Sequence, residues 1–322
     1  MFLIFDTETT GLPKRWDAPI SDINNWPRVV QLAWQLHDDN GVLISNKSYL
    51  IKPTDFDIPF ESEKVHGIST MLASQNGRDI QTVLDEFLKD LKSCEYIVGH
   101  NLKFDINVVA SELFRLDIEN QLLNKVVLDT CTENTANVCK LPGGKSGKFK
   151  FPTLVELYEN LFKNKFENAH NASADVEANA MVFFELIRQK LFDPNLIQDL
   201  ENFHTKVSGT YSNQVGTFGI NHINLKAESK KLKEQNQTDK LNNDDLVNNN
   251  SNSDYVHLHN NSQFSVLQST TKISDLVKKT ADYKMNAVAL TDKANMMGCF
   301  HFYRAVKSCL LYTSDAADEQ QR

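Results

Sequence analysis

The chain begins Met1-Phe-Leu-Ile-Phe-Asp-Thr-Glu8, and this stretch decides how the rest of the sequence is interpreted. Residues 2–5 are apolar and stop at Asp6, which predicts a short buried strand. Asp6 and Glu8 are two positions apart, so their side chains share one face of that strand. Two carboxylates on one face repel unless cations lie between them, and Mg²⁺ or Mn²⁺ favours such oxygen ligands. Taken alone, the pair is equally compatible with two solvated acids at a strand end.

Working outward, the pattern predicts an α/β layer. Two further strands, 29–36 and 42–51, flank the turn His37-Asp-Asp-Asn-Gly41, which has Asn-Gly at its centre as hairpins favour. Apolar periodicity then predicts helices at 80–91, 105–116, 153–162 and 173–191, with Thr153 and Ser173 as N-caps. Short strands at 96–98 and 126–128 alternate with the helices. The expected fold is a mixed five-stranded sheet flanked by helices over residues 1–192.

The remainder is expected to be less regular. Residues 193–254 are interpreted as a helical tail and an Asn-rich linker, and 224–254 carry too little apolar surface to fold. Residues 255–307 predict one βαβα unit, with strands at 256–259 and 287–290 and helices at 273–283 and 296–307. Residues 308–322 are polar and acidic, and our hypothesis is a truncated fragment with a non-native tail. The genomic reading frame beyond Lys307 tests that hypothesis.

Composition limits the classes of function. The net charge is −8, so the whole chain is no general nucleic-acid binder. A local patch of Lys140, Lys145, Lys148 and Lys150 is either a track for a DNA backbone or a solvated loop. Five cysteines without a C-x-x-C pair favour a reducing cytoplasm. No signal peptide is expected, and no apolar run approaches 18 residues, so no membrane span is predicted.

Further candidate ligands follow the first pair. Asp105 opens a predicted helix after the strand 96–98, and Asp175 lies near the start of the final long helix. Each is equally explained as an acid that stabilises a helix N-terminus. His170 precedes Asp175 by five positions, and a single histidine is more often structural than catalytic.

Three motifs in order resemble those of the DEDDh exonuclease superfamily. They are Phe5-Asp-Thr-Glu-Thr-Thr-Gly-Leu12, Val98-Gly-His-Asn-Leu-Lys-Phe-Asp105 and His170-Asn-Ala-Ser-Ala-Asp175. The resemblance implies a ribonuclease H-like fold and two Mg²⁺ (or Mn²⁺) ions held by Asp6, Glu8, Asp105 and Asp175. It also implies that His170 is the general base and that nucleoside 5′-monophosphates are released, which suits two-metal chemistry and an imidazole.

The same resemblance implies contacts with the 3′-terminal nucleotide. By position they are Thr9, Gly11, Leu12, His66 (in Val65-His-Gly-Ile68), Asn101 and Phe104. Leu12 and Phe104 are equally expected as ordinary core residues.

The C-terminal piece resembles the start of a PHP domain, a (βα) barrel. The similarity lies in Tyr255-Val-His-Leu-His259, Gln263-Phe-Ser265 and Ala289-Leu-Thr-Asp292, and the segment to Lys307 is most similar to bacterial DNA polymerase III alpha subunits. His257 and His259 are a possible metal-site remnant. Lys293 and Asn261 stand where the family often has histidine, which argues against a catalytic metal site here.

Three hypotheses remain. The first is a proofreading 3′→5′ exonuclease within a polymerase III alpha subunit, acting on a DNA 3′ end and meeting replisome components such as the sliding clamp. The second is a stand-alone exonuclease that acts on RNA or serves as an epsilon-like subunit. The third is a non-catalytic polymerase-binding module, which the complete set of catalytic positions disfavours.

Overall fold

The computed structural model describes residues 1–166, 170–197, 199–235, 259–265, 269–283, 285, 287–293 and 296–308. The chain divides into two compact units, Met1–Asp239 and Lys240–Arg322. The first unit holds the sheet and all three exonuclease-like motifs, so it contains the candidate functional site.

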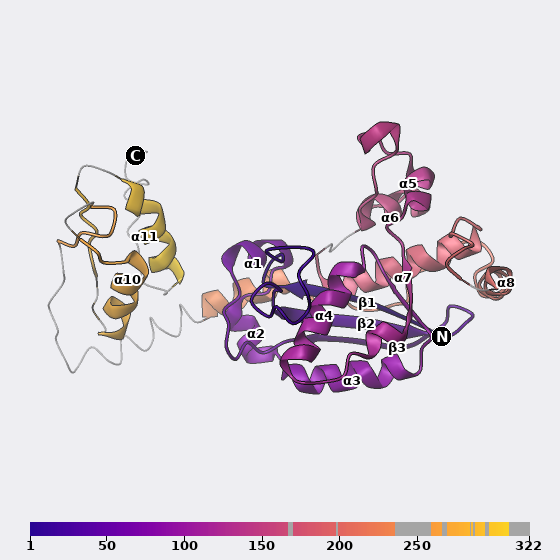
Figure 1. Cartoon of the computed structure of the whole chain (residues 1–322), viewed down its shortest axis with the longest axis horizontal. Helices are drawn as coiled ribbons and strands as arrows, with labels where there is room; N and C mark the ends of the chain where they lie inside the picture. The colour runs from indigo at the N-terminus through magenta and orange to yellow at the C-terminus, as the bar shows by residue number, and fades with distance from the viewer. Residues whose placement is uncertain are drawn as a thin grey trace. The chain divides into compact units, whose positions relative to one another are not determined.

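The first unit is built on a mixed five-stranded sheet (Figure 1). Its strands are β1 (Phe2–Thr9), β2 (Val29–His37), β3 (Leu43–Leu50), β4 (Tyr96–Gly99) and β5 (Val126–Asp129), in the order β3-β2-β1-β4-β5. β2 runs antiparallel to β1 and to β3, whereas β4 is parallel to β1 and to β5. Gly41, at φ +81°, supplies the left-handed backbone that the β2–β3 turn requires. The predicted fold class is confirmed.

The alternation of side chains along β1 divides the core into two layers. Phe2 and Ile4 pack against α7 (Ala172–Arg188) and α8 (Leu200–Thr210). Leu3 and Phe5 point to the opposite face and pack against α3 (Ile80–Lys92) and α4 (Lys103–Arg115). Because β1 is central, its even-numbered positions continue toward α7 and its odd-numbered positions toward α4. Asp6 and Glu8, at even-numbered positions, therefore point toward α7.

Shorter helices complete the unit. They are α1 (Phe60–His66), α2 (Thr70–Asn76), α5 (Glu133–Cys139), α6 (Leu154–Phe162) and the 3-10 turns η1 (Gln121–Asn124) and η2 (Lys145–Gly147). Thr153 caps α6 as predicted, through a reciprocal capping box with Glu156. The predicted N-cap Ser173 is wrong: Asn171 caps α7 by accepting the Ser173 N–H. The asparagine stands before the first helical residue, where a cap must be.

A strap, residues 215–235, returns from α8 to the sheet. The Val215 N–H donates to Glu185, and the Phe218 N–H donates to Glu177, both on α7. Residues 225–235 then form a helix beside α1 and α2 (Figure 1). The predicted linker over 224–254 is therefore wrong for 225–235, because Leu225 is buried in a cluster with Ile68 and Leu72. The linker's remaining residues, 236–254, lie outside the described residues.

In the second unit, α10 (Ile273–Asp282) and α11 (Met297–Ser308) form as predicted. Ile273, Val277 and Val306 make a small core between them. The strand predicted over 287–290 is wrong beyond one bridged position, Val288. Most of the other predicted strand, 256–259, and all but the first residue of the predicted tail 308–322 lie outside the described residues.

Candidate metal centre and active site

Three acids converge where β1 meets the start of α7. Asp6 and Glu8 occupy even-numbered positions of β1 and so face α7, which contributes Asp175 from its first turn. One carboxylate oxygen from each of these three residues lies within 4.8 Å of the others. This convergence was predicted from the two-residue spacing and from the third motif.

The electrostatics of these acids favour a bound cation. Withdrawal from water and the neighbouring acids raise the pKa of Asp6 well above its ordinary value. Burial, then Asp175 and Asp105, raise the pKa of Glu8 to about 8, and burial raises the pKa of Asp175 to about 7. A divalent cation offsets the repulsion and the loss of hydration that make these carboxylates costly to ionise together. All of the candidate ligand atoms are oxygens, as Mg²⁺ and Mn²⁺ prefer. The donor set therefore fits Mg²⁺ or Mn²⁺.

Asp105 is placed differently from the other three acids. It opens α4, on the opposite face of the sheet, and Thr7 reaches it from an odd-numbered position of β1. The Thr7 N–H and Oγ1–H both donate to Asp105 Oδ1, at 3.0 and 2.6 Å. Burial raises the pKa of Asp105 to about 7, against these bonds. Asp105 lies close enough to raise the pKa of Asp6 but outside the three-acid cluster.

His170 is tied to the cluster through its backbone. Its N–H donates to Asp175 Oδ2 at 3.0 Å, and its side chain is exposed. Its φ is +66°, a left-handed conformation that is uncommon for residues other than glycine. The strained turn sets the predicted base beside a predicted metal ligand, as function often requires.

The predicted nucleotide contacts near the first motif differ in their exposure and in their hydrogen bonds. Thr9 Oγ1 donates to the Gly11 carbonyl, so the two residues form one turn. Leu12 is 72% exposed, which excludes the alternative that it is a core residue. His66 is buried, and burial outweighs its backbone bond to Thr9 and lowers its pKa to about 4. The charge of His170 lowers the pKa of His66 further, which indicates that His66 lies near the predicted base. With this pKa, His66 is a neutral donor or acceptor at pH 7.

The second motif is held by a residue that sequence reasoning missed. Asp129, at the end of β5, accepts the N–H groups of Asn101 and Leu102 at 2.8 and 2.9 Å. Asn101 is exposed and has φ +60°. Phe104 is half-buried against the α3–α4 core and lies 5.8 Å, centroid to centroid, from Trp16. Phe104 is thus partly a core residue. Its contact with Trp16 was not predicted from any of the three motifs.

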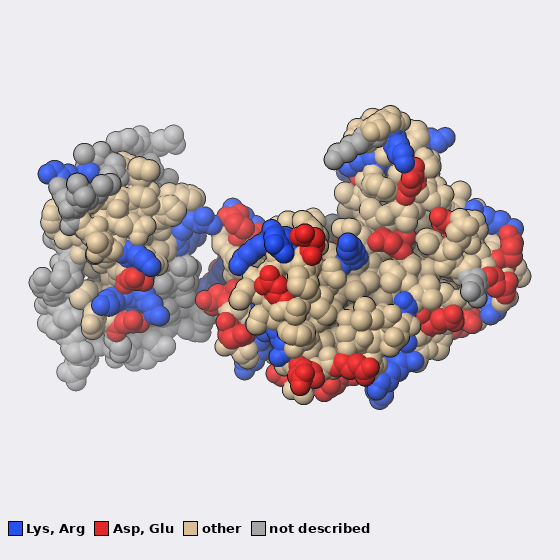
Figure 2. All heavy atoms as spheres, viewed as in Figure 1, with Lys and Arg blue, Asp and Glu red and all other residues tan. Residues whose placement is uncertain are grey.

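The lysine loop is only partly available as a DNA track. Lys148 pairs with Glu133 at 2.7 Å, and Lys150 pairs with Glu156 at 2.8 Å. The acids flanking the loop thus neutralise two of its four lysines. On the face drawn in Figure 2, lysine and arginine are interspersed with acids. Because basic and acidic residues are mixed on this face, any attraction for a DNA backbone must come from individual basic residues close to the site.

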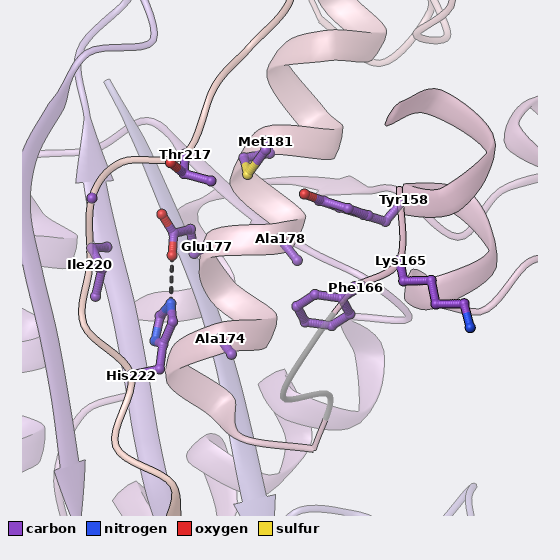
Figure 3. A pocket seen from close by; sticks show the side chains of 11 residues that line it. Tyr158, Lys165, Phe166, Ala174, Glu177, Ala178, Met181, Thr217, Ile220 and His222 are labelled. Atoms are coloured by element: carbon purple, nitrogen blue, oxygen red, sulfur yellow. Dashed lines mark hydrogen bonds and ion pairs between the residues drawn. The ribbon is translucent and has the colours of Figure 1, made fainter. Parts of the chain in front are cut away.

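A pocket of about 290 Å³ adjoins the N-terminal half of α7. Figure 3 shows the strap forming one wall with Thr217, Ile220 and His222, while Tyr158 and Phe166 face it across α7. His222 bonds to Glu177 at 2.5 Å and to Ser173 Oγ at 3.0 Å. His222 also lowers the pKa of Asp175, so the strap reaches the metal cluster electrostatically.

In the second unit, the structure describes only one of the two histidines of the predicted metal-site remnant. His257 lies outside the described residues. His259 is exposed, and its Nδ1 lies 3.1 Å from Thr291 Oγ1. Asp292 accepts three hydrogen bonds from Ser262 and Ser265. Burial raises the pKa of Asp292, but these bonds outweigh it and lower the pKa. These bonds stabilise a loop, and the only group of three or more candidate metal ligands found among the described residues is the one on β1 and α7.

Residues 3–183 match the exonuclease family, which is more than half of the chain. The chain belongs to the exonuclease family. Residues 257–311 match the PHP domain, so an exonuclease domain precedes a PHP segment. No helix in the described part of the chain is long and apolar enough to cross a membrane.

Relatives of this exonuclease chain include two kinds of bacterial protein. The 3′-5′ exonuclease DinG of Bacillus subtilis is 28% identical over 65% of this chain and 22% of its own length. The DNA polymerase III subunit epsilon of Rickettsia conorii is 28% identical over 59% of this chain and 76% of its own length. The chain thus spans about a fifth of the first relative and three quarters of the second.

Solved structures similar to this exonuclease chain include E. coli exonuclease I in complex with a dA16 oligonucleotide. It has a TM-score of 0.46 and 21% identity, over 61% of this chain and 42% of that one. Exonuclease X in complex with 5′ overhanging duplex DNA has a TM-score of 0.43 and 20% identity, over 62% of this chain and 99% of that one.

Proposed function

We propose that the first unit is a two-metal 3′→5′ exodeoxyribonuclease that removes nucleoside 5′-monophosphates from a DNA 3′ end. One observation carries the proposal: Asp6, Glu8 and Asp175 converge within 4.8 Å in a chain of the exonuclease family. The name of the Bacillus subtilis relative, a 3′-5′ exonuclease, supports the direction of hydrolysis.

In this proposal each residue has a defined task. Asp6, Glu8 and Asp175 hold Mg²⁺ or Mn²⁺, with Asp105 as a further ligand from α4. When bound, the ions would supply activation of a water and stabilisation of the leaving 3′ oxygen. His170 would accept the proton of the attacking water, and its exposed side chain and the bond from its backbone N–H to Asp175 support this role.

In this proposal the terminal nucleotide is held by the residues that the resemblance to the exonuclease family predicts as its contacts. Leu12 and Phe104 offer apolar surface to its base and sugar. Thr9, Gly11, His66 and Asn101 are polar or backbone contacts at the same rim. The exposure of Leu12 and the neutral state of His66 support these roles.

The test is release of mononucleotides from a 3′-mismatched primer with Mg²⁺. Asp6→Asn removes one ligand charge and should lower the rate by at least about a thousandfold, since a bound ion supplies several kcal/mol of transition-state stabilisation. Asp85→Asn, an exposed acid on α3, is the matched control and should act like the parent. An inactive parent, or an Asp6→Asn variant as active as the parent, overturns the proposal.

RNA and DNA of one sequence, compared in the same assay, decide between DNA and the alternative RNA substrate.

We further propose that the parent protein is a DNA polymerase III alpha subunit of the cytoplasm, where the exonuclease proofreads and the sliding clamp is a partner. A PHP match at 257–311, C-terminal to the exonuclease match at 3–183, supports this parent over an epsilon-like subunit. The gene beyond Lys307 tests it: polymerase motifs are expected there, and a stop codon favours the epsilon-like alternative. The start of the PHP segment at 255–307 and the non-native tail 308–322 are proposals of the same kind.

A further inference from the structure

The strap brings a lysine to the rim of the metal cluster from outside the segment that matches the exonuclease family. The family match ends at residue 183. Lys226 lies in the first turn of the 225–235 helix and is exposed. It is therefore a residue that none of the three motifs announces.

Two anchors fix the position of Lys226. On one side, Asn171 Nδ2 donates to the Ile223 carbonyl at 2.9 Å, and Asn171 directly follows the predicted base. On the other side, Ser229 Oγ donates to the Gly67 carbonyl at 2.6 Å and accepts the Ser69 N–H at 3.1 Å. These anchors join the His170 turn and the turn after His66, and Lys226 lies between them in sequence.

The contact at Gly67 is close. A β-carbon added to Gly67 would lie 2.3 Å from Lys226 Cγ and 2.8 Å from its backbone nitrogen. The stem of Lys226 thus packs directly on the turn that carries His66. The charge of Lys226 acts on both His66 and Glu8. These two effects place Lys226 near one predicted metal ligand and one predicted nucleotide contact.

Neither an ion pair within the described residues nor helix stability accounts for a cation at this position. Lys230, Lys231 and Lys233 on the same helix pair with Glu234, Glu228 and Glu63. Among the described residues, Lys226 has no such ion pair. A cation in a first turn also opposes the helix dipole, so helix stability does not favour it.

We propose that Lys226 is a substrate-binding residue that contacts a phosphate of the DNA strand in the exonuclease site. A flexible stem that ends in an ammonium suits a phosphate as a point charge. The strap then completes the active site as well as covering α7. This inference rests on the proposed exonuclease function and adds the phosphate contact to it.

The test measures binding and turnover on the full chain. Binding of a short single-stranded oligothymidylate is followed at several salt concentrations, with Ca²⁺ replacing Mg²⁺ so that hydrolysis does not interfere. Lys226→Met keeps the packed stem and removes the charge. It should weaken binding about tenfold and lower the slope of log K against log salt by about 0.7, the value for one phosphate of a single strand. With Mg²⁺, KM should rise by about the same factor while kcat changes less than about twofold.

Controls separate this role from folding. Lys230→Met makes the same change one turn later and should leave affinity, slope and melting temperature unchanged. Lys226→Arg keeps the charge and should retain most of the affinity. An active parent whose Lys226→Met variant binds with unchanged affinity and slope overturns the inference alone. A parent that releases no nucleotide overturns the proposed function itself.

Discussion

At the scale of single residues, the four predicted ligands are not equivalent. Asp6 and Glu8 were predictable as a same-face pair because strand geometry alone fixes that relation. The separate placement of Asp105 was not, because it depends on which face of the sheet α4 covers. Thr7, the residue between the pair, settles it by bonding to Asp105 from the opposite face.

Thr7→Val tests the importance of that bond. The substitution removes the 2.6 Å hydrogen bond that orients Asp105 and favours its charged form. Metal affinity and activity are expected to fall about tenfold, as for other residues that position ligands. Calorimetric titration with Mn²⁺ measures the affinity. Thr205→Val, on remote α8, is the control, and an unchanged affinity in Thr7→Val would show that Asp105 needs no such support.

The raised pKa values of Glu8, Asp105 and Asp175, about 8, 7 and 7, predict proton release on metal binding. Each acid has a pKa above its ordinary value, so without metal it is partly protonated near pH 6.5. A cation displaces those protons. Apparent affinity should therefore rise with pH up to about 8 and then level off. Titration in buffers of different ionisation enthalpy counts the protons, and an affinity that is constant from pH 6 to 8 would contradict these shifts.

At the scale of elements, the long periodic helices and the hairpin were predictable, and the strap was not. Its helix has apolar residues at 225 and 232 with Ser229 between them, the spacing of one helical face. The surrounding lysines and asparagines masked that pattern. The packing partners, Ile68 and Leu72, lie more than 150 positions away in sequence, so only tertiary structure identifies the contact.

Gly67→Ala tests the docking of the strap helix. Gly67 has φ +80°, which costs a residue with a β-carbon about 1–2 kcal/mol, and the new methyl group would collide with Lys226. We expect a lower melting temperature together with DNA binding as weak as that of Lys226→Met. Gly216→Ala, where nothing lies within 4 Å of the added carbon, is the matched control. A variant that binds DNA normally would separate the strap from the site.

At the scale of the whole molecule, the first unit extends past the sequence-based limit at 192. Phe203, Val207, Val215 and Leu225 are all buried in its cores. The apolar residues at 196, 200, 203 and 207 have helical spacing, but the sequence alone does not show what such a helix packs against.

Two shortened proteins test this extent. A protein of residues 1–239 should fold and keep the exonuclease activity of the full chain. A protein of residues 1–192 should lose more than about 5 kcal/mol of unfolding free energy, at about 1.5–3 kcal/mol for each large apolar side chain that loses its burial. Urea denaturation of both proteins measures the difference. Equal stability would mean that the segment after 192 adds nothing to the fold.

The cluster of acids on β1 and α7 also makes the divalent cation a determinant of how long the protein survives in a cell. An ion that binds the folded chain alone lowers the unfolded fraction in proportion to its occupancy. Proteases act mainly on that fraction. Shortage of the ion would thus deplete the protein itself, and the loss of the proposed exonuclease activity would outlast the shortage until new chains were made.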